Sequence, residues 1–136
     1  MHHRLLPAIL CLCFWAATPA RADGLNAVAS IGPAHSLLSG VMEGVGTPEL
    51  ILRGGASPHD YALKPSDARQ LNGARLVFWV GPNLEGFLVR PLSSLADTIR
   101  VVQLSAGGQS DDPHIWLDPR GAAAIVGKMV EALAGV

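Results

Sequence analysis

The residues that decide the fold are Leu-Val-Phe-Trp-Val at positions 76–80, which run directly into Gly81-Pro82-Asn83. Five successive apolar residues that end at turn-forming residues indicate a strand buried on both faces, as the strands of parallel sheets are. Three further runs have a β-like character, at residues 25–31, 49–52 and 99–104. The sequence therefore predicts four strands, the third of them buried on both faces.

A stretch with helical character follows each predicted strand. Leu37, Leu38 and Val41 repeat with helical spacing after the first strand. Pro65 and Pro119 fall at the first positions of later helices, where proline is tolerated. Strands that alternate with helices predict an α/β fold, namely a parallel four-stranded sheet whose right-handed crossovers place helices on both faces. The expected helices cover residues 34–45, 65–71, 84–95 and 121–133.

Two histidines lie in loops that would follow strands of this sheet. His59 occurs in Gly-Ala-Ser-Pro-His-Asp-Tyr at residues 55–61, and His114 in Asp-Pro-His-Ile-Trp-Leu-Asp-Pro at residues 112–119. Ligand sites in open α/β sheets lie at the carboxyl ends of the strands. We expect equivalent loops of adjacent βα units, which would bring the two imidazoles together as the start of a zinc or similar metal site.

Neither histidine identifies a metal site alone, because a single loop histidine is usually solvated and zinc is normally four-coordinate. His35, at the start of the helix after the first strand, could be a third ligand, a helix N-terminal residue or a wall of the cleft. Glu85 falls in the first turn of a predicted helix, where the helix dipole stabilises a carboxylate. It could instead accept a hydrogen bond from a ligating imidazole. We therefore assign only His59 and His114 as metal ligands.

Other residues near these motifs have structural explanations. Asp118 is expected to cap the last helix, with Pro119 at its first position. No HExxH, GxSxG, phosphate-loop or GxGxxG motif points to other chemistry. Asp60 is expected to face away from the site or cap its loop, Asp111 and Asp112 to be solvated, and Trp79 and Trp116 to lie in the core.

Residues 1–22 have the pattern of a secretory signal peptide. A short basic segment ending at Arg4 precedes an apolar stretch at residues 5–17, and Ala20-Arg21-Ala22 is a small-residue cleavage motif. The mature chain should then begin at Asp23. Cys11 and Cys13 both lie in the apolar stretch, so the mature protein would have no thiol for a disulfide or for a metal. His2 and His3 belong to the same leader and are not expected to be ligands.

The charge balance excludes some partners. Cleavage would remove Arg4 and Arg21, which takes ten basic residues to eight against eleven acidic ones, and the net charge from −1 to −3. This mild acidity argues against nucleic acid or an anionic membrane surface as a partner. The remaining chain of about 114 residues has the size of one domain with a single hydrophobic core.

Both histidine motifs resemble the metal-binding signatures of the zinc and manganese substrate-binding proteins of ABC importers, the cluster A-I, ZnuA-like family. Further matches are Ser-Ile-Gly-Pro at residues 30–33, Pro-Ser-Asp at 65–67 and Val-Gly-Pro-Asn-Leu-Glu at 80–85. The resemblance covers nearly all of residues 25–136, and the motif around His114 is the more specific of the two.

The resemblance implies an exported protein of two α/β lobes joined by a long helix, with the metal in the cleft between the lobes. It implies that His59 and His114 are ligands, and that a second lobe supplies a further histidine and a carboxylate. The last predicted helix is followed only by Ala134-Gly135-Val136, so we expect residues 23–136 to be the N-terminal lobe alone. Residues 105–111 stand where zinc-specific members often have a long loop rich in histidine and acidic residues.

We therefore expect a periplasmic receptor, cleaved after Ala22, that captures Zn²⁺ and delivers it to the membrane permease of an ABC importer. Two imidazoles favour zinc, because manganese prefers more oxygen ligands. Mn²⁺ is the alternative, since the short loop at residues 105–111 weakens the preference for zinc. We expect a monomer without enzymatic activity. The rival class is a secreted zinc-dependent hydrolase, which needs a carboxylate placed to activate water, and only Glu85 is a candidate for that role.

Overall fold

Four parallel strands form the central layer of the molecule, in the order β2-β1-β3-β4. The computed structural model describes residues 24–106 and 112–136. The strands are β1 (Ala27–Ala29), β2 (Glu49–Leu50), β3 (Leu76–Trp79) and β4 (Arg100–Gln103). The predicted four-stranded parallel sheet is therefore confirmed, and β1 and β3 are its central strands.

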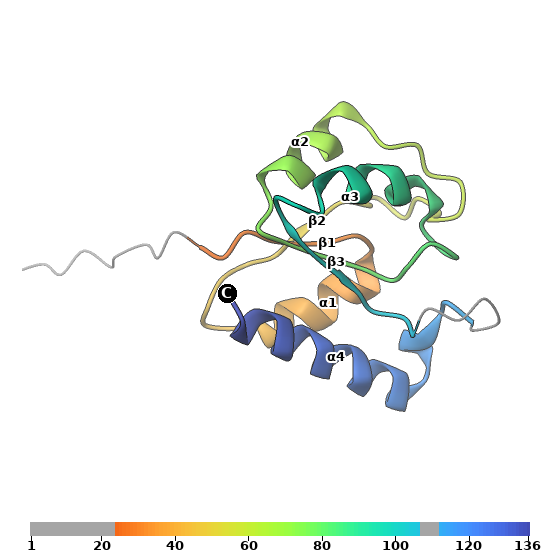
Figure 1. Ribbon diagram of the computed structural model, residues 1–136. Helices are drawn as coiled ribbons and strands as arrows, with labels where there is room; N and C mark the ends of the chain where they lie inside the picture. Colours follow the sequence, from red (N-terminus) through yellow and green to blue (C-terminus); the bar gives the residue numbers. More distant parts are fainter. Residues whose placement is uncertain (1–23, 107–111) are drawn as a thin grey trace, which may run out of the picture.

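Two helices cover each face of the sheet, as the right-handed crossovers predict. Figure 1 shows α1 (Gly32–Val41) and α4 (Pro119–Ala134) on one face, and α2 (Pro65–Gly73) and α3 (Val89–Leu95) on the other. Each pair of helices thus packs on one face, which gives the sheet two hydrophobic cores where the chain length suggested a single one.

Alternate residues of the central strands contribute to different cores. In β1, Ala27 and Ala29 belong to the core under α1 and α4, whereas Val28 belongs to the core under α2 and α3. In β3, Phe78 and Val77 divide in the same way, and all five of these side chains are almost fully buried. The apolar run at residues 76–80 is therefore explained, because both faces of β3 are covered.

The third helix begins later than the sequence predicts. The expected helix from Leu84 is instead a 3₁₀ turn, η1 (Gly86–Leu88), followed by α3 from Val89. Pro91 explains the late start, because it has no backbone N–H for an α-helical bond to residue 87 and is tolerated only in a first turn. Glu85 consequently precedes the 3₁₀ turn instead of lying in the first turn of an α-helix.

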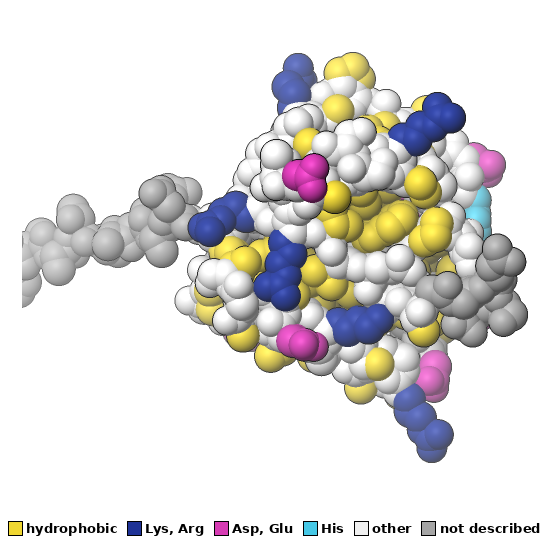
Figure 2. Space-filling model, viewed as in Figure 1, with side chains coloured by type: hydrophobic (Ala, Val, Ile, Leu, Met, Phe, Trp, Pro, Cys, Tyr) yellow, Lys and Arg dark blue, Asp and Glu magenta, His cyan; other side chains and the backbone are white. Residues whose placement is uncertain are grey.

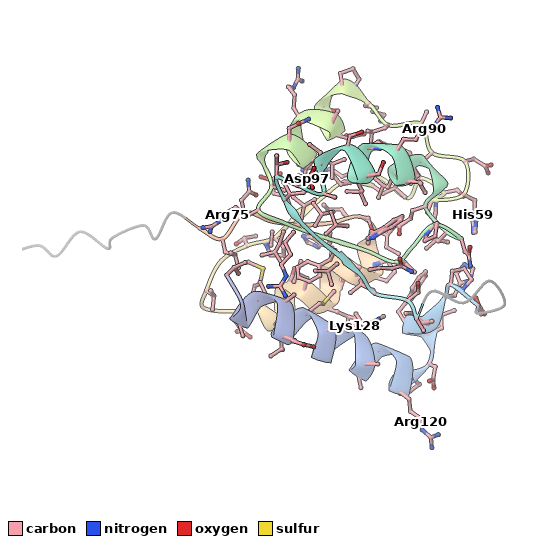
Figure 3. All side chains as sticks on the ribbon, viewed as in Figure 1. His59, Arg75, Arg90, Asp97, Arg120 and Lys128 are labelled. Carbon is pink, nitrogen blue, oxygen red and sulfur yellow. The ribbon has the colours of Figure 1, made fainter. Side chains whose placement is uncertain are left out.

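Two basic side chains attach α4 to the edge strand β4. Lys128 on α4 reaches toward the sheet (Figure 3), and its Nζ donates to the carbonyl oxygens of Leu104 at 2.8 Å and Ser105 at 3.1 Å. Arg100 on β4 donates in the other direction, to the carbonyl oxygen of Ala132 at 3.1 Å. The Lys128 bonds fix the chain immediately after β4, whereas the Arg100 bond ties the start of β4 to the end of α4.

On the face drawn in Figure 2, basic and acidic side chains are interspersed around apolar ones. That pattern agrees with the near-neutral composition of the chain. None of the helices in residues 24–106 and 112–136 has the length and apolar character that a membrane span requires.

Candidate metal centre

His59 and His114 come from opposite ends of the sheet. His59 follows β2 and His114 follows β4, which are the two edge strands. The expectation of adjacent βα units is therefore wrong, since three strand spacings of about 4.8 Å separate the edges by about 14 Å. The two ring centroids nevertheless lie 5.8 Å apart, with the ring planes inclined by 48°. The loop that contains His59 and the segment at residues 112–116 bring the rings together at one pocket.

The two imidazoles line one pocket of about 460 Å³ at this edge. The pocket lies beside the start of α1, at Gly32 and Pro33, and against the end of β2. His59 is exposed and His114 is half-buried, so a small ligand could reach both rings from solvent. The remaining lining residues are Ile31, Leu50, Leu52, Gly54, Gly55, Ala56, Pro58 and Trp116.

The separation of the rings suits a shared metal ion. With a zinc–nitrogen bond of about 2.0–2.1 Å and about 1.1 Å from nitrogen to ring centre, two imidazoles on one tetrahedral ion have centroids roughly 5 Å apart, and at most about 6 Å. The observed 5.8 Å falls within that range. Within the described ranges, no group of three or more histidine, cysteine or acidic side chains is placed to hold a metal ion, so this site offers two ligands.

Glycines and the contacts of a half-buried tyrosine shape the loop that contains His59. Gly54 and Gly55 both have φ of +74°, in the left-handed region that favours glycine. The hydroxyl of Tyr61 donates to Asp67 Oδ2 at 2.8 Å, and the Tyr61 ring packs edge-on against Phe87 with centroids 5.1 Å apart. His59 is thus placed between a sharp turn and a fixed aromatic side chain.

Asp67 is the centre of a hydrogen-bond group below that loop. It accepts from the backbone N–H of Lys64 at 2.9 Å and from the hydroxyls of Tyr61 and Ser66. Burial alone would raise the pKa of Asp67, but these hydrogen bonds together lower it. The pKa of Tyr61 is raised, mainly by its hydrogen bond to Asp67 and also by burial.

His114 is held from two sides. Asp112 Oδ1 lies 2.7 Å from His114 Nδ1 and accepts from the His114 backbone N–H at 2.9 Å. The Trp116 ring meets the imidazole edge-on, with centroids 5.3 Å apart. The backbone N–H of His114, and then its ring, lower the pKa of the Asp112 carboxyl. Asp112 is therefore exposed, as expected, but it is a partner of His114 and not simply solvated.

His35 does not join the two imidazoles. Its Nε2 lies 3.1 Å from the carbonyl oxygen of Pro48, in the turn that precedes β2. It does not line the pocket that His59 and His114 share. Of the three alternatives that the sequence leaves open, the structure favours a helix N-terminal residue with a local contact.

Glu85 is fully buried and makes no hydrogen bond to either imidazole within the described part of the chain. Its Oε2 accepts from the backbone N–H groups of Val80 at 2.6 Å and Gly81 at 3.1 Å. Burial raises the pKa of Glu85, against the opposing effects of the Ser30 hydroxyl and the two N–H groups. Of the two roles that the sequence left open for Glu85, the bond to a ligating imidazole is not formed in the described residues, and Glu85 instead secures the turn after β3.

Of the remaining residues near the two motifs, some have the predicted environment and others do not. Asp118 caps α4 by accepting from the Gly121 N–H at 3.0 Å, as predicted. Trp79 is buried in the core, as predicted, whereas Trp116 is only half-buried and lines the pocket. Asp60 is exposed, and Asp111 lies outside the described residues.

Sequence reasoning missed the role of Asp112. An aspartate two residues before a histidine, with a proline between them, can fold its carboxylate back onto the histidine N–H as an Asx turn does. That local signal, Asp-Pro-His at residues 112–114, was available in the sequence.

Similar proteins are found both in sequence and in structure. The family described as "ZnuA: Zinc-uptake complex component A periplasmic" matches residues 27–136. The high-affinity zinc uptake system protein ZnuA of Yersinia pestis is 40% identical over 97 residues, which is 71% of this chain and 30% of that protein. The ZnuA of Brucella abortus (strain 2308) is 49% identical over 77 residues, which is 57% of this chain and 23% of the relative.

Solved structures share the fold. The periplasmic zinc binding protein TroA from Treponema pallidum superposes with a TM-score of 0.74 at 21% identity, over 82% of this chain and 44% of TroA. The Zn(II)-bound ZnuA-like domain of AdcA from Streptococcus pneumoniae gives 0.73 at 22% identity, over the same shares of the two chains. The fold is thus that of one lobe of a periplasmic substrate-binding protein.

The family match extends over most of the described sheet and helices and includes both histidine motifs. The chain belongs to the ZnuA family. It spans about half or less of the length of the relatives reported above.

Proposed function

We propose that this protein captures Zn²⁺ outside the cytoplasm and delivers it to the membrane permease of an ABC importer, with His59 and His114 as two of the zinc ligands. One observation carries the proposal. His59 and His114 follow strands at opposite edges of the sheet, yet both line a single pocket. The centroids of their imidazole rings are 5.8 Å apart. A shared tetrahedral ion explains why two imidazoles from opposite edges of the sheet lie at this distance.

The donor atoms favour zinc over manganese. Imidazole nitrogen suits zinc, whereas manganese prefers carboxylate, carbonyl and water oxygens. Relatives in Yersinia pestis and Brucella abortus are named zinc uptake proteins, which supports the same preference. Manganese is the alternative cargo, since a structurally similar protein of Candidatus Liberibacter asiaticus is described as Mn-bound, at 18% identity and a TM-score of 0.70.

Two imidazoles occupy only half of a four-coordinate zinc shell. We propose that residues 23–136 form the N-terminal lobe of a two-lobed receptor and that a second lobe supplies a histidine and a carboxylate. Residues 1–22 would direct export to the periplasm, and the mature receptor would act as a monomer.

Binding without catalysis fits the pocket better than hydrolysis does. A catalytic zinc needs a general base beside its bound water. Glu85, the one candidate from the sequence, is fully buried, engaged by two backbone N–H groups and not among the residues that line the pocket. The relatives are named as uptake proteins, in agreement with a protein that performs no chemistry.

Titration calorimetry with zinc tests the proposal. The purified protein should bind zinc, and His59→Ala or His114→Ala should each weaken binding on the order of tenfold or more. His35→Ala is the matched control, since that ring contacts Pro48 and not the pocket. Equal zinc binding by the wild type and both site variants would refute the proposal.

A further inference from the structure

We propose that Asp112 is a positioning residue for zinc binding, in that its carboxylate holds the proton of His114 on Nδ1 and so leaves the Nε2 lone pair free for the metal. The inference rests on the proposed function, because it assigns the ligating atom of the same site.

One oxygen atom makes both contacts to His114. Asp112 Oδ1 is 2.7 Å from the ring Nδ1 and 2.9 Å from the backbone N. An ionised carboxylate only accepts hydrogen bonds, so the close contact requires the ring to donate from Nδ1. The backbone bond fixes where that oxygen lies relative to the His114 main chain. The same carboxylate oxygen therefore fixes both the orientation of the His114 ring and the nitrogen that carries its proton.

The two sides of the His114 ring face different surroundings. Asp112 lines a hollow with Ile115, Leu117 and Asp118, and His114 borders this hollow as well. Asp112 does not line the pocket that His114 shares with His59. Because Asp112 engages Nδ1 and does not line the shared pocket, we infer that Nε2 is the nitrogen available to a metal there.

The arrangement has a chemical consequence. A neutral imidazole has one protonated and one bare nitrogen, and only the bare nitrogen can bind a metal. Metal-binding histidines commonly donate their other N–H to a carboxylate, which fixes the tautomer and makes the ligating nitrogen more basic. The contact between Asp112 Oδ1 and His114 Nδ1 has this arrangement. Trp116, edge-on at 5.3 Å, limits the remaining rotation of the ring.

The first readout is the tautomer of His114 without metal, measured by long-range ¹H–¹⁵N correlation spectra of the imidazole nitrogens. The wild type should show the Nδ1–H form, and Asp112→Ala should shift His114 toward the Nε2–H form that a free imidazole favours. Asp112→Asn should keep the Nδ1–H form, because the amide oxygen can still accept. A His114 that stays Nδ1–H in Asp112→Ala overturns the inference.

The second readout is zinc affinity by calorimetry. Asp112→Ala should lose about 10- to 100-fold, and Asp112→Asn distinctly less. Asp60→Ala is the matched control, because Asp60 is an exposed aspartate next to His59 and makes no hydrogen bond to either imidazole in the described residues. An equal loss in Asp60→Ala and Asp112→Ala would indicate a general charge effect and overturn the inference.

The two proposals fail in different ways. If His114→Ala abolishes binding while Asp112→Ala changes only the tautomer, positioning by Asp112 is refuted and the proposed function stands. If His114→Ala binds zinc as the wild type does, the proposed function is refuted, and the claim that Asp112 prepares a zinc ligand is refuted with it.

Discussion

A Cβ atom on Gly121 would overlap the backbone carbonyl oxygen of Ile115. Gly121 lies in the first turn of α4, and Ile115 begins the 3₁₀ turn η2 (Ile115–Leu117) that directly follows His114. The helix therefore packs directly on the backbone of the turn next to His114. The position of His114 depends on a close approach that only glycine permits.

Gly121→Ala should displace the turn after His114. We expect a loss of about 1–3 kcal/mol in the free energy of unfolding, because the obstructing atom is backbone and cannot rotate away. Zinc affinity should fall as well. Gly127→Ala is the control in the same helix, since a Cβ there meets nothing within 4 Å and alanine should stabilise an exposed helix by about 0.5–1 kcal/mol. Urea unfolding and calorimetry measure both effects, and a Gly121→Ala variant as stable as Gly127→Ala would contradict the packing argument.

Gly55→Ala should disturb the loop that contains His59. At a φ of +74° an alanine costs about 1–2 kcal/mol, although a Cβ there meets nothing within 4 Å. The expected loss is thus conformational and not steric. Gly40→Ala in α1 also meets nothing within 4 Å and has no positive φ, so it should not destabilise the protein. Identical unfolding midpoints for the two variants would show that the turn is not strained.

Glu85→Gln should change how stability depends on pH. The folded-state pKa of Glu85 is raised above its ordinary value near 4.5, mainly by burial. Its contribution is therefore fully present below that value and is lost as pH rises through the raised folded pKa. Gln should keep an oxygen that accepts from Val80 and Gly81 without a buried charge. We expect the variant to gain stability relative to the wild type as pH increases from about 4 to 8.

Chemical unfolding across this pH series measures the difference between wild type and variant, so that other titrating groups cancel. Glu131→Gln, a substitution at an exposed position of α4, serves as the control and should show no such trend. A constant difference between wild type and Glu85→Gln at every pH would refute the assignment.

Export should remove residues 1–22. The basic start, the apolar stretch and Ala20-Arg21-Ala22 predict that the exported protein begins at Asp23. Mass spectrometry of the protein recovered from the periplasm of an expressing bacterium would give the N-terminal residue. Ala22→Leu should block cleavage there, because the signal peptidase requires small residues at this position. An intact N-terminus in the exported wild type would contradict the prediction.

The local pattern of the sequence was sufficient for the architecture. Continuous apolar residues at 76–80 predicted a strand covered on both faces, and the structure buries them between two cores. Pro119 and Asp118 marked the start of α4 correctly, because capping and proline geometry act within a few residues. The start of α3 was misjudged, although Pro91 was the local reason for it.

Only the tertiary structure decided which residues meet at the site. The order β2-β1-β3-β4 places the strands before His59 and His114 at opposite edges of the sheet, yet the two rings lie 5.8 Å apart. Sequence spacing does not encode which loop residues meet, because this depends on how the elements beneath them pack. For the same reason Glu85 turned inward to the backbone N–H groups after β3, and Asp112 became the partner of His114. The sequence by itself identified the fold and the two imidazoles, while packing determined their separation, their orientation and the carboxylate that contacts one of them.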